Sequence, residues 1–244
     1  MINKKTYIEK GEGETILLLH GLFGALSNWK STLTFLSKNY RVIIPLIPIT
    51  EVNIKMANIS GLTKYIESFV KELNLKKFTI IGNSLGGHIG LMFTLLNPKK
   101  VTKLVLTGSS GLYENSFGNS YPKRDDYEWM NNRVNYTFYD SKILSKKKIN
   151  QIFKTLNDNL KCLNIITIAR SAQRENLTRR LKEIKCSTLL IWGLNDTITP
   201  PYVAHQFNNL IKSSELQFID KCCHAPMMEH PKTFNKIIGS FLKT

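Results

Sequence analysis

The stretch "TIIGNSLGGHIGL", Thr79–Leu91, decides the fold of this 244-residue chain. Its first half is a short apolar run that ends at Gly82, which is typical of a buried strand. Its second half continues with apolar side chains at helical steps, namely Leu85, Ile89, Met92 and Leu96. Ser84 therefore stands in a very short turn between a strand and a helix.

The glycines around Ser84 indicate a nucleophile elbow. In such a turn the serine adopts a strained backbone, and its hydroxyl is exposed at the carboxyl end of the sheet. Small residues two places before and after the serine let the strand and helix approach, and Gly82 and Gly86 hold those places. The alternative is a tight turn in which the serine only caps the helix. The G-x-S-x-G pattern alone is weak, because chance produces it in about one chain in twelve of this length.

Short apolar runs alternate with helical segments along most of the chain. We expect strands at 15–20, 40–48, 77–82, 102–108, 187–193 and 215–220. Helical spacing occupies the segments between them. Strands that alternate with helices predict an α/β fold with a parallel sheet covered on both faces.

Residues 118–182 interrupt this alternation. The segment is helical and polar, contains no convincing strand, and lies between two strands of the regular series. We interpret it as a helical cap inserted into a core made of residues 1–117 and 183–244. The cap carries 14 Lys and Arg against 6 Asp and Glu, so its charge is much denser than that of the core.

A serine hydroxyl is a poor nucleophile until a base takes its proton, so a histidine is needed at the same edge of the sheet. Of the five histidines, His224 has the required place, in the loop "DKCCHAPMMEHP" directly after the last expected strand. His88 and His205 lie within helices. His230, at a helix start, is the second choice for the base.

The base in turn needs a carboxylate to orient it. Asp196 lies in "LLIWGLNDTITPP", three residues beyond the end of an expected strand at Gly193. If it stood alone, it would be interpreted as a turn aspartate. Together with the other two residues it gives the chain order Ser84, Asp196, His224, which is the order of one particular hydrolase fold.

Two backbone N–H groups are expected to form an oxyanion hole. One comes from Leu85, the residue after the serine, and the other from a loop after an earlier strand. The stretch "LLLHGLFGALSNW" fits this loop, since Gly21 and Gly24 permit an unusual backbone. Leu22 is the first choice for the second donor, and Phe23 is the second choice.

With four motifs in this order, the chain resembles the α/β-hydrolase family. The motifs are "HGLFG", "GNSLGG", "WGLNDTITPP" and "CCHAPMMEHP", and the resemblance extends from Thr15 to the C-terminus. It implies an eight-stranded, mostly parallel sheet and a cap over a serine, aspartate and histidine triad. Because the elbow carries serine and not aspartate, dehalogenation of haloalkanes and epoxide hydrolysis of the usual kind are not expected.

The chain departs from the family pattern at two places. Many relatives carry an aspartate and glycines in a loop where this chain reads "IPLIPITEV", so the shape of the pocket is expected to differ. The residue before the base histidine is often glycine, but here it is Cys223. A thiol beside the base makes the activity sensitive to alkylation or oxidation unless it is buried.

Composition limits the remaining classes of protein. Apolar residues make up 42% of the chain, no apolar run approaches a membrane span, and no signal peptide is evident, so a cytoplasmic protein is expected. The four cysteines lack the spacing of a zinc site and are expected to be free thiols. The expected chemistry needs no cofactor and no metal.

These residues together predict a serine hydrolase that cleaves carboxylic esters through an acyl-enzyme. Phe23, Tyr121 and Trp129 are the candidate substrate-binding residues, although aromatic packing within the cap explains the last two equally well. The same triad also serves thioesters, amides and carbon–carbon bonds. Another class stays open, since some members of the fold act as ligand receptors or scaffolds.

The net charge of +16 raises the question of a macromolecular partner. Nucleic acid is not expected, because no recognition module appears. The basic cap suits an acidic acyl carrier protein, and esterases that demethylate a pimeloyl group on such a carrier resemble this layout. A soluble face in a lysine-rich protein explains the charge as well. The expected partner is therefore a small ester substrate, and an acidic acyl carrier protein docked on the cap is the further partner that the charge allows.

Overall fold

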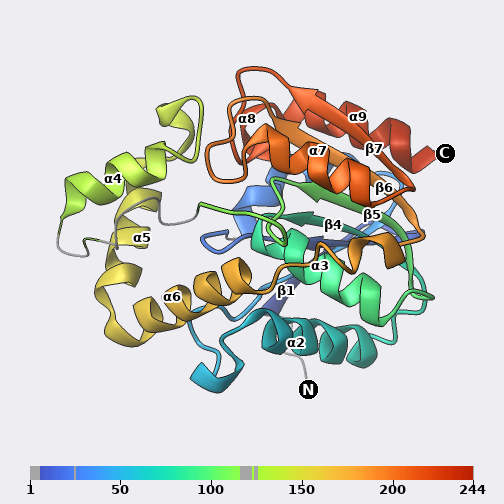
Figure 1. Ribbon diagram of the computed structural model, residues 1–244, viewed down its shortest axis with the longest axis horizontal. Coiled ribbons are helices and arrows are strands. Elements are labelled where there is room, and N and C mark those ends of the chain that lie inside the picture. The colour runs from blue at the N-terminus through green and yellow to red at the C-terminus, as the bar shows by residue number, and fades with distance from the viewer. Residues whose placement is uncertain (1–5, 25, 116–122, 124–125, 244) are drawn as a thin grey trace.

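The computed structural model describes residues 6–24, 26–115, 123 and 126–243. A single sheet runs through the centre of the molecule, in the strand order β1-β3-β2-β4-β5-β6-β7 (Figure 1). The strands are β1 (Tyr7–Lys10), β2 (Thr15–Leu19), β3 (Arg41–Pro45), β4 (Phe78–Asn83), β5 (Val101–Thr107), β6 (Ser187–Gly193) and β7 (Ser214–Ile219). Each pair is parallel except β1 with β3. The carboxyl ends of six strands therefore meet at one edge.

The central strands are buried on both faces. In β2, Ile16 and Leu18 belong to one buried apolar cluster, whereas Leu17 and Leu19 belong to another. This alternation follows from the two-residue period of a strand. The sheet therefore separates two apolar cores, each of which needs a covering layer of helices.

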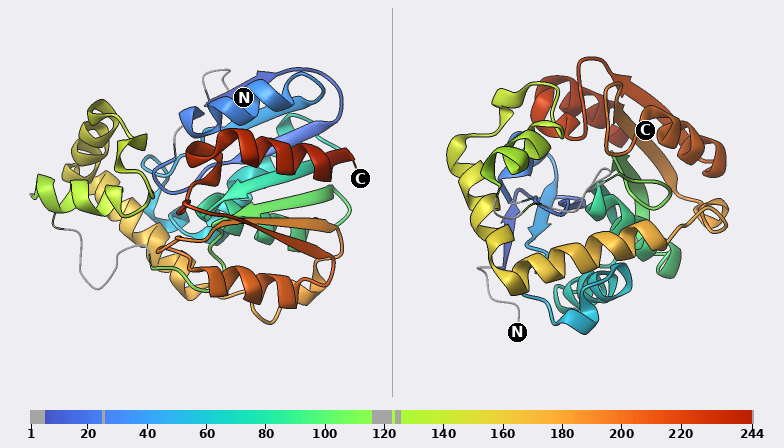
Figure 2. Two further views of the ribbon diagram at one scale, coloured as in Figure 1. Left: turned by 90° about the horizontal axis from the view of Figure 1, so that it is seen from above. Right: turned by 60° about the vertical axis from the view of Figure 1, so that its left-hand side comes forward.

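Helices supply both covering layers. On one face lie α1 (Lys30–Leu36) and α9 (Pro231–Lys243), and on the other lie α2 (Ile59–Glu72), α3 (Leu85–Leu96) and α7 (Pro201–Leu210). The view from above in Figure 2 shows α1 and α9 side by side. Short helical turns complete the core: α8 (Pro226–Glu229), η2 (Leu26–Trp29), η3 (Ile54–Met56) and η5 (Leu181–Glu183). The α/β prediction is confirmed.

The cap helices lie between β5 and β6 in the chain. They are α4 (Tyr127–Asn135), α5 (Lys146–Asn157) and α6 (Asn159–Arg174), with the short turn η4 (Ser141–Ile143) between the first two. Figures 1 and 2 show α4 and α5 standing away from the sheet, while α6 returns toward the core. Asp158 divides α5 from α6, because its side chain accepts hydrogen bonds from the N–H groups of Leu160 and Lys161 and so caps α6.

The expectation of eight strands is wrong for the described residues, which form seven. Residues 6–14 provide one edge strand and the turn into β2, with Gly11 and Gly13 at positive φ, and leave no room for a further strand there. No helix in the described part of the chain has the length and apolarity needed to cross a membrane.

Candidate active site

The turn between β4 and α3 has the geometry of a nucleophile elbow. Ser84 adopts φ 54° and ψ −120°, a backbone conformation that non-glycine residues rarely take. A Cβ atom at Gly82 would lie 2.5 Å from the carbonyl oxygen of Gly86, and one at Gly86 would collide with the backbone of Leu19. The strand and the helix therefore approach too closely for any side chain at these two positions.

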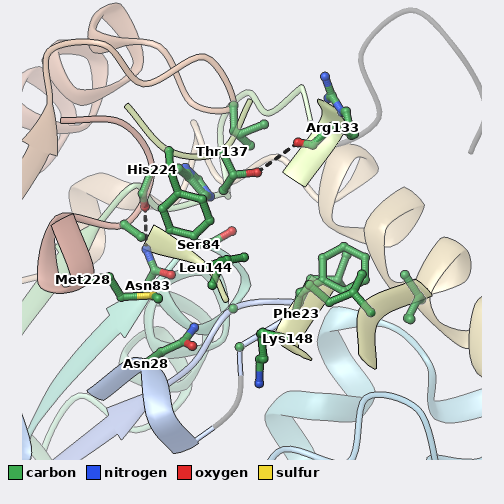
Figure 3. Close-up of a pocket in the computed structure, with 18 of the residues that line it drawn as sticks. Phe23, Asn28, Asn83, Ser84, Arg133, Thr137, Leu144, Lys148, His224 and Met228 are labelled. Carbon is green, nitrogen blue, oxygen red and sulfur yellow. Dashed lines mark hydrogen bonds between the residues drawn. The ribbon is translucent and has the colours of Figure 1, made fainter. Parts of the chain in front are cut away.

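The two other residues predicted for the triad meet at the carboxyl edge of the sheet. Nδ1 of His224, in the loop after β7, lies 2.9 Å from Oδ2 of Asp196, in the loop after β6. Both side chains are buried. The Ser84 side chain and His224 line the same cavity, as Figure 3 shows. The structure thus brings Ser84, His224 and Asp196 to one place.

Asp196 is held as an acceptor from several directions. Its Oδ1 accepts the backbone N–H groups of Ile198 and Thr199 at 2.8 and 2.9 Å, and its Oδ2 accepts the Thr199 hydroxyl at 2.9 Å. Burial by itself lowers the pKa of His224, but the charge and hydrogen bond of Asp196, with Glu114 and Glu229 beyond it, raise that pKa above 6.5. The Asp196 carboxylate therefore stabilises the imidazolium form of His224.

Sequence reasoning missed several residues that position His224. The Asn83 amide donates to the carbonyl oxygens of Thr107 and His224, each at 3.0 Å. Oε1 of Glu229 accepts the N–H groups of Cys223 and Ala225, on either side of the histidine, at 3.0 and 3.3 Å. For Glu229 the one available signal was its place in the motif that contains His224.

Gly108, directly after β5, was also missed. It has φ +50°, and a Cβ atom there would lie 2.9 Å from Nδ1 of His224 and 3.2 Å from Oδ2 of Asp196. Any side chain at this position would press on the contact between His224 and Asp196. Its neighbour in the chain, Thr107, ends an ordinary strand, so the sequence gives no sign of this constraint.

The segment Tyr136–Tyr139 of the cap is hydrogen-bonded to the loops that carry Asp196 and His224. The carbonyl oxygen of Thr137 accepts the N–H of His224 at 3.2 Å. The N–H of Tyr139 donates to Oε2 of Glu229 at 2.7 Å, and the Thr197 hydroxyl donates to the carbonyl oxygen of Tyr136 at 3.0 Å. The geometry of the triad therefore depends on the cap as well as on the sheet.

The loop proposed to carry the second oxyanion donor is held in place by a hydrogen bond from the segment after β3. The N–H of Ile47 donates to Nε2 of His20 at 3.0 Å, and Nδ1 of His20 lies 2.9 Å from the Gly21 carbonyl oxygen. Burial lowers the pKa of His20, which favours the neutral ring that accepts this bond. Leu22 and Phe23 follow directly and line the cavity. Leu85 is the first residue of α3, and its role as the other donor stays a prediction.

A cavity of about 160 Å³ opens beside Ser84, between the core and the cap. Most of its lining is apolar, including Leu144, Ile152, Leu156, Ile165, Ile198 and Met228. Of the aromatic residues predicted to bind substrate, Phe23 and Trp129 line it. Tyr121 lies outside the described residues. The lining therefore favours apolar groups beside Ser84.

His230 and Cys223, the other histidine and cysteine considered near the site, are held by hydrogen bonds to backbone carbonyl groups. His230 lies close to the Lys221 carbonyl oxygen, at 2.8 Å from Nε2, so the second choice for the base is engaged elsewhere. Cys223 is buried, its thiol donates to the Asn195 carbonyl oxygen at 2.9 Å, and burial raises its pKa to about 12. The thiol beside the base is therefore protected from alkylation.

Comparisons with known proteins agree with this fold. A family model described as the alpha/beta hydrolase fold matches residues 14–139. An alpha/beta hydrolase enzyme from a lagoon-sediment metagenome, MGS-MChE2, is 35% identical, with a TM-score of 0.80, covering 97% of this chain and 94% of the other. The serine hydrolase CarC, involved in carbazole degradation, is 27% identical, with a TM-score of 0.81, covering 97% and 93%. The chain belongs to the α/β-hydrolase family.

Curated relatives point to the general kind of reaction. The 2-hydroxy-6-oxononadienedioate/2-hydroxy-6-oxononatrienedioate hydrolase 1 of Pseudomonas putida is 29% identical over 97% of this chain and 90% of its own length. The hydrolase of 2-hydroxy-6-oxo-6-(2'-aminophenyl)hexa-2,4-dienoic acid from Metapseudomonas resinovorans is 27% identical, over 97% and 86%. Together they support hydrolase activity for this chain.

Proposed function

We propose that this chain is a serine hydrolase that cleaves carboxylic esters through an acyl-enzyme. The observation that carries the proposal is the strained Ser84 beside a cavity that also holds His224, with His224 bonded to a buried Asp196. Ester cleavage needs a nucleophile, a base and an oxyanion hole, and this site provides candidates for each.

The proposed reaction has two halves. His224 takes the proton of the Ser84 hydroxyl as the oxygen attacks the ester carbonyl, and then gives that proton to the departing alcohol. Water enters, His224 takes its proton, and the acyl-enzyme is hydrolysed to a carboxylic acid and free Ser84. Asp196 holds the histidine tautomer and stabilises the imidazolium. The N–H groups of Leu85 and Leu22 hold the oxyanion, each contributing about 3 kcal/mol in comparable sites.

Hydrolysis of p-nitrophenyl esters from acetyl to dodecanoyl tests this proposal. We expect turnover with an optimum chain length set by the cavity, and loss of that turnover in Ser84→Ala. The exposed Ser213→Ala provides a matched control for the loss of a serine hydroxyl. Ester turnover that survives in Ser84→Ala would contradict the assignment of the nucleophile.

Cleavage of a carbon–carbon bond is the second candidate, and the names of the curated relatives favour it. The acids in those names contain no ester or amide bond, so their hydrolysis must break a bond between carbons. A carbon leaving group needs more stabilisation than an alkoxide, and the substrate must supply it. Loss of the dienoate absorbance on incubation with a 2-hydroxy-6-oxo-dienoic acid, without turnover of simple esters, would favour this candidate.

We also propose that an acidic acyl carrier protein docks on the basic cap. Cationic residues of α5 and α6 and of the segment that follows are exposed, including Lys146, Lys147, Arg174 and Arg179. A purified acidic carrier should bind with an affinity that falls as salt rises, because exposed charges are screened. Replacing these four residues by glutamine should abolish that binding. Absence of salt-sensitive binding would contradict the docking proposal.

A further inference from the structure

The charged residues of the cavity are few and of one sign. Arg133 and Lys148 line it beside the mostly apolar side chains, together with the His224 ring. No aspartate or glutamate is found among the described lining residues. A carboxylate inside the cavity would therefore meet cations and no competing anion.

Of the two cations, Arg133 is held by contacts within the protein, although its buried Nε has no hydrogen-bond partner among the described residues. Its Nη2 donates to the Asn115 carbonyl oxygen at 2.6 Å, and its guanidinium lies 5.3 Å from the centre of the Tyr136 ring. Figure 3 shows this guanidinium directed away from Ser84. Arg133 is thus placed to hold the wall of the cavity together.

Lys148 differs in having no such engagement. Its side chain is half-buried, and the described residues offer its ammonium group neither an ion pair nor a hydrogen bond. Burial lowers its pKa, since removing water from an ammonium disfavours the charge. Figure 3 shows Lys148 beside Phe23, apart from His224. The charge therefore lies at a different part of the cavity from the reacting groups.

The position of Lys148 in its helix further disfavours an unpaired positive charge. It belongs to the first turn of α5, which begins with Lys146 and Lys147 and contains no acidic residue. Cations are disfavoured at a helix N-terminus, where the helix dipole is positive. An anion beside Lys148 would offset both the repulsion and the lost hydration.

We propose that Lys148 binds a carboxylate carried by the substrate at the end remote from the scissile bond. This inference rests on the proposed ester hydrolysis and names its substrate class. An acyl chain bound at Ser84 would pass along the apolar lining and place its terminal carboxylate at the ammonium. A single negative charge matches the Lys148 ammonium, which has no ion-pair partner among the described residues, whereas a phosphate monoester would bring nearly two charges into an apolar cavity.

The proposal can be tested by the ratio of kcat/KM between two substrates that differ only in whether the free end is charged. We would measure kcat/KM for p-nitrophenyl monoesters of linear dicarboxylic acids of four to nine carbons, each against the ester whose free end is a carboxamide. We expect the carboxylate to be preferred about tenfold at one or two chain lengths, as for a charge-assisted hydrogen bond. Lys148→Gln should remove this preference, and Lys232→Gln, at an exposed residue of α9 outside the cavity lining, should keep it.

A second arm places the charge on the alcohol, with butyrate esters of 4-hydroxybenzoate and 4-hydroxybenzamide. A Lys148-dependent preference in this arm would support the anion site and assign it to the leaving group. If neither arm shows a preference, or if Lys148→Gln leaves it unchanged, the proposal is wrong.

The anion site can also be tested without turnover. Calorimetric titration of the Ser84→Ala protein with the p-nitrophenyl monoesters of the same linear dicarboxylic acids should detect binding. Lys148→Gln should weaken this binding about tenfold. Binding without ester turnover would contradict the proposed reaction and keep the anion site. Ester turnover without this binding or preference would keep the proposed reaction and contradict the anion site.

Discussion

At the residue scale, the proposed role of His224 as the general base predicts that its pKa governs how activity depends on pH. The general base must be neutral to accept the serine proton, and its raised pKa keeps it protonated to a higher pH than an ordinary histidine. We therefore expect kcat/KM to fall as pH decreases, with half of the maximal value reached above pH 6.5. A pH profile with a neutral ester measures this limb. An acid limb centred well below pH 6.5 would contradict the conclusion that Asp196 raises the pKa of His224.

Asp196→Asn tests the source of this shift. Without the carboxylate, burial dominates, so the acid limb should move to lower pH. The loss of the correct tautomer should reduce kcat by about 10⁴-fold, as in comparable triads. Asp220→Asn, at an exposed residue after β7, should leave the profile unchanged. An unmoved limb in Asp196→Asn would show that another group sets the pKa of the base.

The residues that could be predicted from the sequence are those with a local signal. Ser84 lies between two glycines at a strand-to-helix turn, and Asp196 and His224 each follow a strand. Gly108 gave no such signal, because its importance comes from the contact with His224, which is 116 residues away in the chain and is brought close only by the folded sheet.

At the scale of elements, Glu229 couples the histidine loop to the cap. It accepts N–H groups from both neighbours of His224 and from Tyr139, and its charge raises the pKa of His224. Glu229→Gln should lower kcat by about tenfold, the usual effect of losing hydrogen bonds to a charged acceptor. It should also shift the acid limb of kcat/KM to lower pH, which a purely structural defect would not do.

The exposed Glu215→Gln, on β7, is the matched control for this change and should behave as wild type. If Glu229→Gln lowers kcat without moving the limb, Glu229 would act only through folding of the loop. If Glu229→Gln and Glu215→Gln changed kcat and the acid limb equally, Glu229 would have no specific role.

Secondary structure could be predicted well because its signals are periodic. The expected parallel strands match β2 to β7 to within a few residues, and the helices between them follow the apolar spacing. The number of strands could not be predicted, since the family resemblance implied eight and the edge of the sheet depends on which N-terminal residues pair with β3. The contacts of Tyr136–Tyr139 join segments about 60 to 90 residues apart and leave no periodic trace.

At the scale of the whole molecule, His88 makes stability depend on pH. Burial lowers its pKa from 6.5 to about 3, with a smaller opposing effect of the Glu175 backbone. The unfolded chain therefore binds a proton below pH 6.5 that the folded protein does not, and stability falls as pH decreases. Between pH 7 and pH 5 this one group should remove about 2 kcal/mol from the free energy of unfolding.

Urea unfolding of the wild type and His88→Leu at pH 7 and pH 5 measures this contribution. Leucine is close to histidine in volume and does not titrate, so the variant should lose about 2 kcal/mol less stability over this interval. The same loss in both proteins would show that His88 titrates normally in the fold.

The cavity is also a property of the whole molecule. Its lining combines the loop after β2, the elbow, the cap helices and the loop after β7. The sequence predicted Phe23 and Trp129 for this lining, but aromatic residues of the cap were equally compatible with its core. Which side chains face the serine depends on how α4 to α6 pack over the sheet, and that packing has no local signal.

Covalent labelling by a fluorophosphonate, measured by intact mass, tests the central claim most directly. An activated serine attacks phosphorus and retains a stable adduct, whereas an inert scaffold does not react. We predict one adduct per chain on the wild type, located at Ser84 by peptide mapping, and none on Ser84→Ala. A folded wild-type protein that remains unlabelled, or an adduct that persists in Ser84→Ala, would contradict the claim that Ser84 is the nucleophile of a serine hydrolase.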